Sequence, residues 1–244
     1  MTDPEHPHWP PERRRARDVL LPCRLHPSED IFLRRRQLAL SPWQLWSSEG
    51  LAGTKQWELS LCLPPDWPYW PDTSPPTLEA FPLLLLRQLV ARLLRKNSRW
   101  RPNHGLWLER TAAPWADLPW PDGWRGLLLL SREGRWLPLA LNAEEEEQWR
   151  AAPAAWLEER RQRSWAELAW PLPTQILLQS QLNRAVALNQ LAQVRKLLAA
   201  GARADYPFYQ NGPLGPLVAG TLLDQARRDG RLVLAELLAE AGAR

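Results

Sequence analysis

The sequence is poor in cysteine, and this scarcity limits the sites that it can build. Only two cysteines, Cys23 and Cys62, occur in 244 residues. Cys23 lies beside a proline in an expected loop, whereas Cys62 lies in an expected strand. Their spacing fits neither a disulfide framework nor a zinc site. We therefore expect two reduced thiols in a cytoplasmic protein.

Long apolar runs are absent, and the first residues lack the pattern of a secretory leader. The leucine runs at 83–86 and 127–130 are far shorter than the about 18 to 20 apolar residues that span a bilayer. The first residues are mostly acidic, histidine and proline residues, without the apolar core of a signal peptide. We expect no membrane span and no secretory signal.

The excess of positive charge is small and lies mainly near the start. The net charge is +4 with 24% charged residues, which is not the balance of a nucleic-acid-binding protein. A short basic run at a terminus is usually solvated. We therefore expect residues 1–17 to form a flexible basic arm, and we expect no nucleic-acid partner.

Phenylalanine, tyrosine and methionine are rare, whereas tryptophan is abundant. The chain has sixteen Trp against three Phe, three Tyr and one Met. Every Trp lies between Trp9 and Trp170, so the last 74 residues have none. This change in composition predicts a domain boundary near residue 170. Because 45% of the residues are apolar, the chain can bury a substantial core.

Apolar periodicity predicts that residues 18–170 form an α+β domain, with helices packed on a mixed or antiparallel sheet. Residues 57–63 alternate between apolar and small or polar side chains, as in a half-buried strand. After Pro82, apolar residues recur at helical spacing. Pro138 predicts an edge strand, because proline lacks a ladder donor. We expect further strands at 18–25, 31–40, 106–108, 126–130 and 136–141, an extended or turning stretch at 41–46, and a helix at 154–163.

Asn142 marks the beginning of another helix. Four glutamates, 144–147, follow it, so that a side-chain cap is succeeded by carboxylates at the positive end of the helix dipole. Successive helical residues point about 100° apart, so these carboxylates cannot converge on one metal ion. We interpret the acidic run as a structural device, and we expect neither a metal nor a cofactor.

Five features occur in a characteristic order along residues 18–163. A strand ends in Leu63-Pro64-Pro65-Asp66-Trp67, a helix begins near Phe81-Pro82, a Trp-bearing loop reaches Asn103-His104-Gly105, an apolar strand follows Gly126, and the acidic helix comes last. In this order the domain resembles the suppressor-of-fused-like domain of bacteria. Ala39 stands where that family usually has a glycine in a Gly-Leu-Ser-x-x-Pro-Met-like turn, and the methionine is missing.

The C-terminal part, residues 171–244, resembles a helix followed by two ankyrin repeats. Residues 221–243 follow the consensus from Thr-Pro-Leu-His-x-Ala to Leu-Leu-x-x-Gly-Ala without a gap, and residues 182–202 form an earlier copy. Asn189 takes the usual glycine position, where asparagine tolerates a left-handed backbone. Leu222 and Asp224 replace the consensus proline and histidine, which we expect to weaken the tight turn before the helix. The resemblance implies an all-α region with repeats at 181–205 and 217–244.

An insert at 206–216 separates the two copies. Gly201 and Gly242 are 41 residues apart, about eight more than one ankyrin repeat allows. The insert contains two of the three tyrosines. We expect it to form an extended finger.

The sequence displays no catalytic motif. It has no Gly-x-Ser-x-Gly elbow, no Walker loop, no His-Glu-x-x-His pair and no paired cysteine motif. A lone histidine such as His104, beside Asn103 and Gly105, is more often a loop anchor than a general base. We expect no catalysis, and the alternative is a hydrolase that uses His104 with an Asp or Glu brought near it by the fold.

Aromatic residues in proline-rich loops are the candidates for partner binding. We expect most tryptophans to pack in the core, with the indole N–H paired to a carbonyl. Not all rings in such loops can be buried, however, and rigid exposed aromatics bind partners at a low entropic cost. The candidate residues are Trp67, Tyr69, Trp70, Trp115, Trp120, Trp124, Tyr206, Phe208 and Tyr209.

Both resemblances imply protein recognition without catalysis. Suppressor-of-fused-like domains sequester a protein partner, and the bacterial members resemble immunity proteins of polymorphic-toxin, contact-dependent and type VI secretion systems. Ankyrin repeats present a concave face and loop tips to a partner. We therefore expect an immunity protein, or antitoxin, that neutralises a cognate toxin domain by direct binding. An intracellular scaffold or regulator that binds another protein is the alternative.

Overall fold

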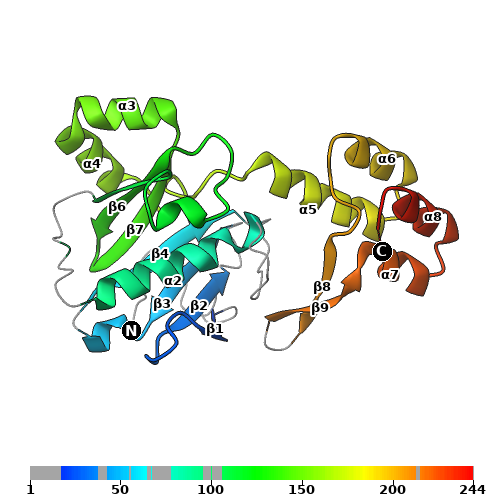
Figure 1. The fold of residues 1–244 in the computed structure, drawn as a ribbon, viewed down its shortest axis with the longest axis horizontal. Coiled ribbons are helices and arrows are strands. Elements are labelled where there is room, and N and C mark those ends of the chain that lie inside the picture. Colours follow the sequence, from blue (N-terminus) through cyan, green and yellow to red (C-terminus); the bar gives the residue numbers. More distant parts are fainter. Residues whose placement is uncertain are drawn as a thin grey trace. The chain divides into compact units, whose positions relative to one another are not determined.

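The chain divides into two compact units. The computed structural model describes residues 18–37, 43–54, 56–64, 67, 78–95, 100, 106–212 and 215–243. Unit 1 comprises Met1–Pro171, and unit 2 comprises Leu172–Arg244. Figure 1 shows a sheet with helices in the first unit and short helices with a hairpin in the second. The boundary lies next to Trp170, the last tryptophan of the chain.

Unit 1 is built on one seven-stranded mixed sheet. Its strands lie in the order β1-β2-β3-β4-β7-β6-β5. All neighbours run antiparallel except β4 and β7, which run parallel. This architecture confirms the predicted α+β class with a mixed sheet. The strands are β1 (Asp18–Arg24), β2 (Phe32–Gln37), β3 (Gln44–Glu49), β4 (Glu58–Leu63), β5 (Leu106–Glu109), β6 (Gly126–Arg132) and β7 (Arg135–Leu141).

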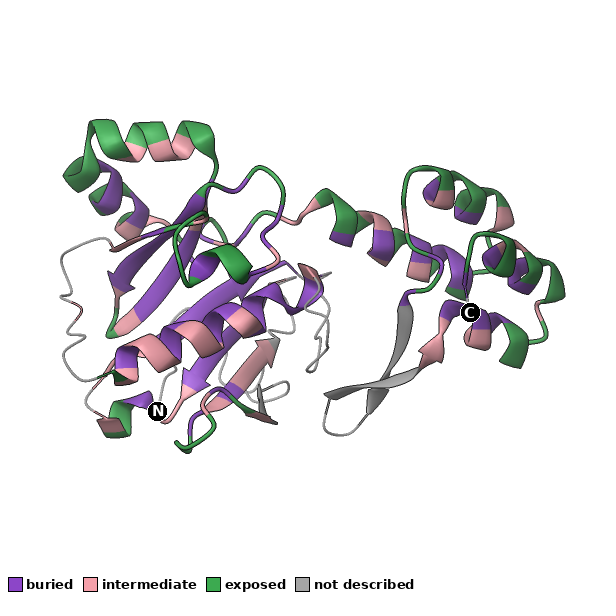
Figure 2. Ribbon diagram, viewed as in Figure 1, coloured by how far each residue is buried: buried purple, intermediate pink, exposed green. Residues whose placement is uncertain are grey.

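The described residues of unit 1 also form three helices and three short 3₁₀ turns. Helix α2 (Phe81–Leu94) crosses the front of the sheet (Figure 1) and buries eight residues. Helices α3 (Ala143–Ala151) and α4 (Pro153–Gln162) follow β7, and Figure 2 shows that α3 is largely exposed. Trp156 and Leu157 of α4 pack against the leucines at 128, 130, 137, 139 and 141 in β6 and β7. The 3₁₀ turns are η1 (Leu51–Thr54), η2 (Leu78–Ala80) and η3 (Trp115–Asp117).

Strand β7 lies inside the sheet, so the edge position predicted from Pro138 is wrong. The pairing of β7 with β4 ends at Trp136, before the proline. The Pro138 carbonyl instead accepts a hydrogen bond from the Trp170 indole at 2.7 Å. In a strand, the N–H and C=O of one residue point to the same side. The N–H that Pro138 lacks would therefore point toward β4, where the pairing between β4 and β7 has already ended. Because the Trp170 backbone N–H also donates to the Cys62 carbonyl of β4 at 2.9 Å, this residue joins β4 to β7.

Unit 2 consists of two helical pairs with a β-hairpin between them. The hairpin occupies the expected finger, so the region departs from the all-α expectation by a two-stranded antiparallel sheet. Prolines at 207 and 216 lack the N–H that a continuing helix would need. The elements are α5 (Thr174–Ala187), α6 (Leu191–Ala199), β8 (Pro207–Gly212), β9 (Gly215–Thr221), α7 (Leu222–Arg228) and α8 (Leu232–Glu240).

Two positions in unit 2 test the expected backbone directly. Asn189, between α5 and α6, has a φ of 55°, which confirms the left-handed backbone at the usual glycine position. Before α7, Thr221 Oγ1 accepts from the Asp224 N–H at 3.2 Å, and the Asp224 carboxylate accepts from the Thr221 N–H at 2.8 Å. This reciprocal cap satisfies two helix donors. Asp224 therefore stabilises the turn, against the expectation that it weakens it.

Across the residues that the structure describes, no helix has both the length and the apolar character needed to cross a membrane.

Candidate functional site

Four of the predicted partner-binding tryptophans lie inside unit 1. The exposed fractions are 1% for Trp67, 3% for Trp115, 7% for Trp120 and 5% for Trp124. The prediction of exposed rings is therefore wrong for these four, because so deeply buried a side chain cannot anchor a partner. The neighbouring candidates Tyr69 and Trp70 lie outside the described residues.

Trp120 and Trp124 pack around Phe81 at the beginning of α2. The Phe81 ring centroid lies 5.1 Å from that of Trp120, 5.7 Å from that of Trp124 and 5.7 Å from that of Trp170. Trp67 lies 5.9 Å from Trp170. The indole N–H groups of Trp67 and Trp120 donate to backbone carbonyls at 3.2 Å and 2.6 Å. Rings packed in this way, with their N–H groups paired, belong to the core.

Of the partner-binding candidates in unit 2, only Tyr206 has a described side chain, and it is buried. Tyr206 is 2% exposed, so the prediction that it contacts a partner is wrong. Phe208 and Tyr209 lie on β8, but their side chains are outside what the structure describes. The same holds for His104, the residue of the hydrolase alternative, which falls in the undescribed stretch 101–105.

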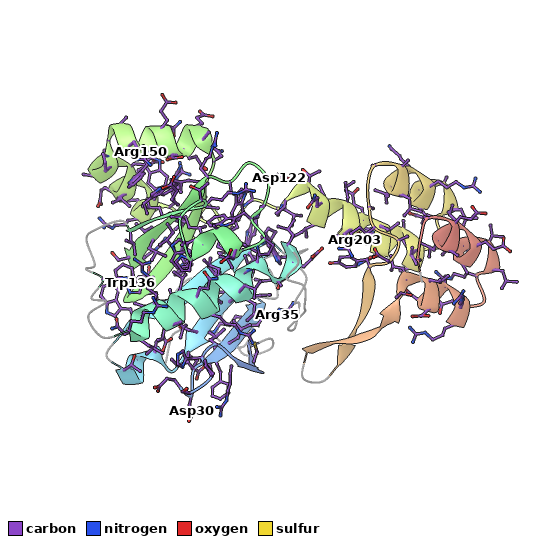
Figure 3. All side chains as sticks on the ribbon, viewed as in Figure 1. Asp30, Arg35, Asp122, Trp136, Arg150 and Arg203 are labelled. Carbon is purple, nitrogen blue, oxygen red and sulfur yellow. The ribbon has the colours of Figure 1, made fainter. Side chains whose placement is uncertain are left out.

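A different aromatic cluster lies where β5 and α3 meet. The rings of Trp107 and Trp149 are stacked, with centroids 5.4 Å apart and planes inclined by 25°. The Arg150 guanidinium lies 5.7 Å from the first centroid and 5.6 Å from the second. Glu146, one turn earlier, accepts hydrogen bonds from Arg150 at 2.9 Å and 2.7 Å. We call these four residues the tryptophan–arginine patch, and Figure 3 labels Arg150 within it.

The tryptophan–arginine patch borders a hollow of about 640 Å³. Trp107 and Glu146 line it, together with Glu109, Arg110 and Arg125. Both tryptophans of the patch are half-buried, so each ring keeps one part in the core and exposes another. Tryptophan and arginine are the residues most enriched where binding energy concentrates in protein interfaces. The hollow therefore has the composition of a protein-binding surface.

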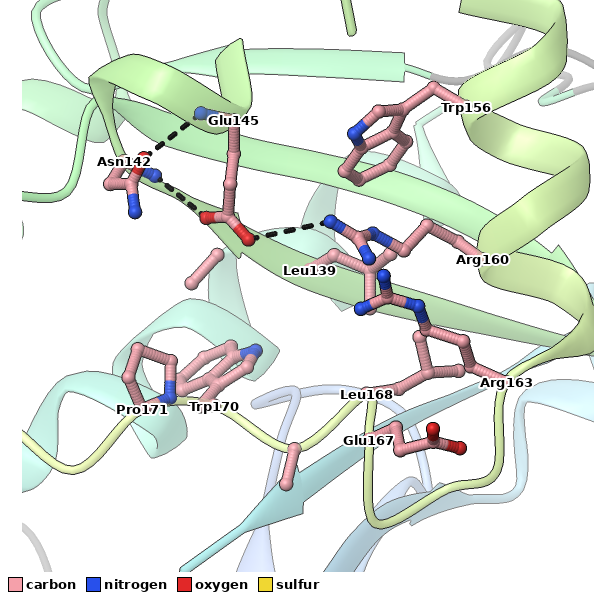
Figure 4. Close-up of a pocket in the computed structure, with 12 residues that line it drawn as sticks. Leu139, Asn142, Glu145, Trp156, Arg160, Arg163, Glu167, Leu168, Trp170 and Pro171 are labelled. Atoms are coloured by element: carbon pink, nitrogen blue, oxygen red, sulfur yellow. Dashed lines mark hydrogen bonds and ion pairs between the residues drawn. The ribbon is translucent and has the colours of Figure 1, made fainter. Parts of the chain in front are cut away.

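A second hollow, the arginine pocket, lies beside the first turn of α3. It has a volume of about 260 Å³ and is lined by parts of β7, α3, α4 and the turn at 163–171 (Figure 4). Asn142 Oδ1 accepts from the Glu145 N–H at 2.9 Å, and the Glu145 carboxylate accepts from the Asn142 N–H at 3.1 Å. This geometry confirms the predicted side-chain cap. Because adjacent helical residues point about 100° apart, Glu145 lines the arginine pocket while Glu146 lines the first hollow.

Two arginines from the end of α4 point into the arginine pocket. Figure 4 shows the guanidinium groups of Arg160 and Arg163 directed into the same space. Arg160 is only 7% exposed and lies 4.4 Å from the Trp156 ring centroid. Carboxylate oxygens of Glu145 and Glu159 lie 3.6 Å and 3.5 Å from its nitrogens, beyond good hydrogen-bond geometry. Arg160 Nη1 is buried with no hydrogen-bond partner.

Arg160 is therefore paired in charge with two glutamates, but its hydrogen-bonding capacity is incompletely used. Burial lowers the pKa of the Arg160 guanidinium, the charge of Arg163 lowers it further, and Glu159 and Glu145 raise it. A guanidinium nevertheless stays protonated in proteins. Glu159 already accepts a hydrogen bond from Arg163 Nε at 3.0 Å, and Glu145 is held by the helix cap. A buried N–H donor without an acceptor in hydrogen-bond geometry is energetically unfavourable.

Unit 2 carries an exposed apolar group on its helices. Leu188, Leu232 and Val233 are 56%, 72% and 56% exposed. Arg231 donates to the Ala187 carbonyl at 3.0 Å, which ties the beginning of α8 to the end of α5 and so brings the segments that carry these residues together. Leu191 begins α6 as Leu232 begins α8, but it is half-buried.

The described residues include no group of three or more His, Cys, Asp or Glu side chains that could hold a metal ion. Both cysteines are free, as predicted. Burial raises the pKa of the Cys62 thiol to about 12, so this thiol is not a nucleophile at neutral pH.

Comparisons of the chain with protein-family models, with curated proteins and with solved structures find no match. The candidate site consequently depends on geometry. Trp107, Trp149 and Arg160 were not among the predicted site residues, and the acidic run was interpreted only as the beginning of a helix. The spacing of Glu146 and Arg150, one helical turn apart, is the signal that points to an organised surface on α3.

Proposed function

We propose that this chain is a non-catalytic protein-binding module, and that it acts in the cytoplasm as an immunity protein that neutralises a cognate toxin domain by direct contact. The tryptophan–arginine patch is the observation that carries the proposal. It replaces the loop tryptophans as the aromatic part of the interface. The chain covers the toxin's active site or blocks its substrate path, and this mechanism requires no catalysis by the chain.

The tryptophan–arginine patch has the physical properties of an interface centre. Truncation of one such tryptophan or arginine at a protein interface commonly costs about 2 to 4 kcal/mol of binding free energy. The stacked rings of Trp107 and Trp149 are already ordered, and Glu146 already fixes Arg150. Because less side-chain freedom is then lost on association, such a surface binds at a reduced entropic cost.

Three further observations support protein recognition. The resemblance of residues 18–170 to suppressor-of-fused-like domains implies sequestration of a protein. The resemblance of residues 171–244 to ankyrin repeats implies the same task, and the exposed Leu188, Leu232 and Val233 supply apolar contact area in that unit. Charges of both signs around the first hollow provide a means of choosing the cognate toxin over others.

Co-purification with a toxin domain encoded in a neighbouring reading frame tests the proposal. Trp149→Ala and Arg150→Ala are each expected to raise the Kd at least about tenfold, which corresponds to about 1.4 kcal/mol. Both variants should also lose the ability to rescue cells that express the toxin domain. Isothermal titration of the purified pair gives the Kd, and survival counts give the rescue.

Arg161→Ala is the matched control for Arg150→Ala. Arg161 is also a helical arginine paired with a glutamate one turn earlier, Glu158, but it lies outside the tryptophan–arginine patch. Its substitution should leave the Kd within about twofold, since an exposed ion pair contributes little. Equal Kd values for folded patch variants and wild type would exclude the patch, and binding without rescue would favour the scaffold or regulator.

A further inference from the structure

We propose that the arginine pocket receives the carboxylate of an aspartate or glutamate side chain from the bound partner protein. This inference rests on the proposed function, because the carboxylate belongs to the neutralised toxin domain. It assigns the partner an acidic side chain that is inserted beside α3, next to the contact made by the tryptophan–arginine patch.

The arginine pocket has an unmet need for an acceptor. Arg160 is 7% exposed, and its Nη1 atom is buried without a hydrogen-bond partner. The two nearby carboxylates face Arg160 only at 3.6 Å and 3.5 Å, and both also accept hydrogen bonds from other groups. Glu145 accepts from the Asn142 N–H, and Glu159 accepts from Arg163. A carboxylate from outside would supply the acceptor and leave these bonds intact.

A monoanionic carboxylate fits the arginine pocket better than a phosphate group. The two guanidinium groups share the space with the carboxylates of Glu145 and Glu167, and Glu159 lies within 3.5 Å of Arg160. A phosphate monoester brings about 1.5 to 2 negative charges and would meet this like charge. A carboxylate brings one charge and has the planar shape that a guanidinium fork accepts at two oxygens.

The size and position of the arginine pocket favour a side chain over a free metabolite. Its volume of about 260 Å³ is below the range of about 300 to 1,000 Å³ typical of small-molecule sites. The first turn of α3 separates it from the hollow at the tryptophan–arginine patch, with Glu145 on one side and Glu146 on the other. A partner surface that covers the patch therefore reaches the pocket within one turn of helix.

The first experiment measures carboxylate binding to the full chain without any partner. Acetate, which carries the carboxylate of an acidic side chain, is titrated at constant ionic strength while the arginine side-chain ¹⁵N signals are followed by NMR. The Arg160 and Arg163 signals should shift and saturate. The saturable shift of the Arg163 signals should disappear in Arg160→Met and remain in the control Arg161→Met. A linear response in wild type, or tighter binding of inorganic phosphate than of acetate, would overturn the assignment.

The second experiment uses the complex with the toxin domain. Arg160→Met should raise the Kd at least about tenfold, and Arg160→Glu should raise it further. A charge reversal at one acidic toxin residue should restore binding to Arg160→Glu. Circular dichroism checks that each variant is folded. If Arg160→Met does not fold, Arg163→Gln replaces it, because this variant leaves the buried Arg160 in place. Arg163→Gln should weaken binding by a smaller factor than Arg160→Met.

The outcomes separate this inference from the proposed function. Wild-type affinity in folded Arg160→Met and Arg163→Gln would overturn the inference, while loss of binding in the tryptophan–arginine patch variants would still support the proposed function. If the wild-type chain binds no toxin domain, the proposed function fails and the partner's carboxylate fails with it. Restoration of binding by the reversed charge pair would support both.

Discussion

The two units of this chain hold their segments together by different means. In unit 1, large aromatic side chains join elements that are distant in sequence, and Trp170 connects β4 to β7 through Cys62 and Pro138. Unit 2 has no tryptophan, and it pairs neighbouring short helices, of which α7 begins with a reciprocal cap between Thr221 and Asp224. The change in composition near residue 170 therefore marks a change from long-range to local stabilisation.

This difference allows each unit to be observed separately. All sixteen tryptophans lie between Trp9 and Trp170, so intrinsic tryptophan fluorescence reports on unit 1. Far-UV circular dichroism detects helices of both units. A substitution in one unit that alters both signals equally would show that the units unfold as one, whereas selective effects would support two independent modes of stabilisation.

The largest effect is expected from Trp170→Ala. The Trp170 ring is 2% exposed and lies 5.1 Å from Trp124 and 5.7 Å from Phe81. Removal of a buried aromatic ring typically lowers the free energy of unfolding by about 3 to 5 kcal/mol. The fluorescence midpoint in guanidinium chloride should fall accordingly. The part of the circular dichroism transition that belongs to unit 2 should stay in place.

Trp170→Phe sharpens this test, because it keeps a ring but removes the indole N–H. The Pro138 carbonyl then loses its donor, which is expected to cost about 1 to 2 kcal/mol. The loss should therefore be smaller than that of the alanine variant. Equal destabilisation by both variants would contradict the role of the ring, and no loss in the phenylalanine variant would contradict the role of the hydrogen bond.

In unit 2, Leu238→Ala should have the next largest effect. Leu238 in α8 is fully buried, and its truncation should cost about 2 to 4 kcal/mol. The loss should appear in circular dichroism and leave the fluorescence midpoint unchanged. Leu232→Ala, in the same helix at 72% exposure, should change stability by no more than about 0.5 kcal/mol. A matching shift in fluorescence would show that the two units are coupled.

Helices and strands could be predicted from the sequence wherever apolar residues recur at a clear helical or strand spacing. They could not be predicted where polar side chains are buried. Residues 41–46 were expected to be extended or turning, and residues 44–46 are indeed extended, but the strand β3 that begins at Gln44 was not predicted. Three of its residues, Gln44, Ser47 and Ser48, are buried polar residues that break the apolar alternation. Their burial depends on partners such as Ser60 Oγ, 3.0 Å from Ser47 Oγ. Such distant pairings are not visible in local periodicity.

The candidate site was less predictable than the fold for a related reason. The loop tryptophans are flanked by prolines and lack a periodic pattern, so only their long-range packing around Phe81 shows that they are buried. The tryptophan–arginine patch joins a strand to a helix 42 residues later, at Trp107 and Trp149. No sequence pattern predicts that two rings from different elements will stack. The composition predicted that aromatic residues take part in binding, but the fold determines which of them remain at the surface.

The smallest expected effects concern acid stability, where each unit contains a carboxylate whose pKa is lowered by hydrogen bonds from a neighbouring residue. Hydrogen bonds from the Thr221 N–H and hydroxyl lower the pKa of Asp224 in unit 2. Hydrogen bonds from the Ser164 hydroxyl and N–H lower the pKa of Glu167 in unit 1. A carboxyl whose folded pKa lies below its unfolded value stabilises the protein above the unfolded pKa. That contribution is lost as the pH falls through the folded pKa.

Asp224→Asn should therefore reduce the acid sensitivity of unit 2 alone, and Glu167→Gln should reduce that of unit 1 alone. Unfolding midpoints measured from about pH 6 down to about pH 3 cover the window in which such carboxylates titrate. The first variant should flatten the pH dependence of circular dichroism, and the second should flatten that of fluorescence. If both probes still fall in parallel in both variants, general charge repulsion at low pH outweighs the local caps, because repulsion acts on the whole chain whereas each cap acts only on its own helix or turn.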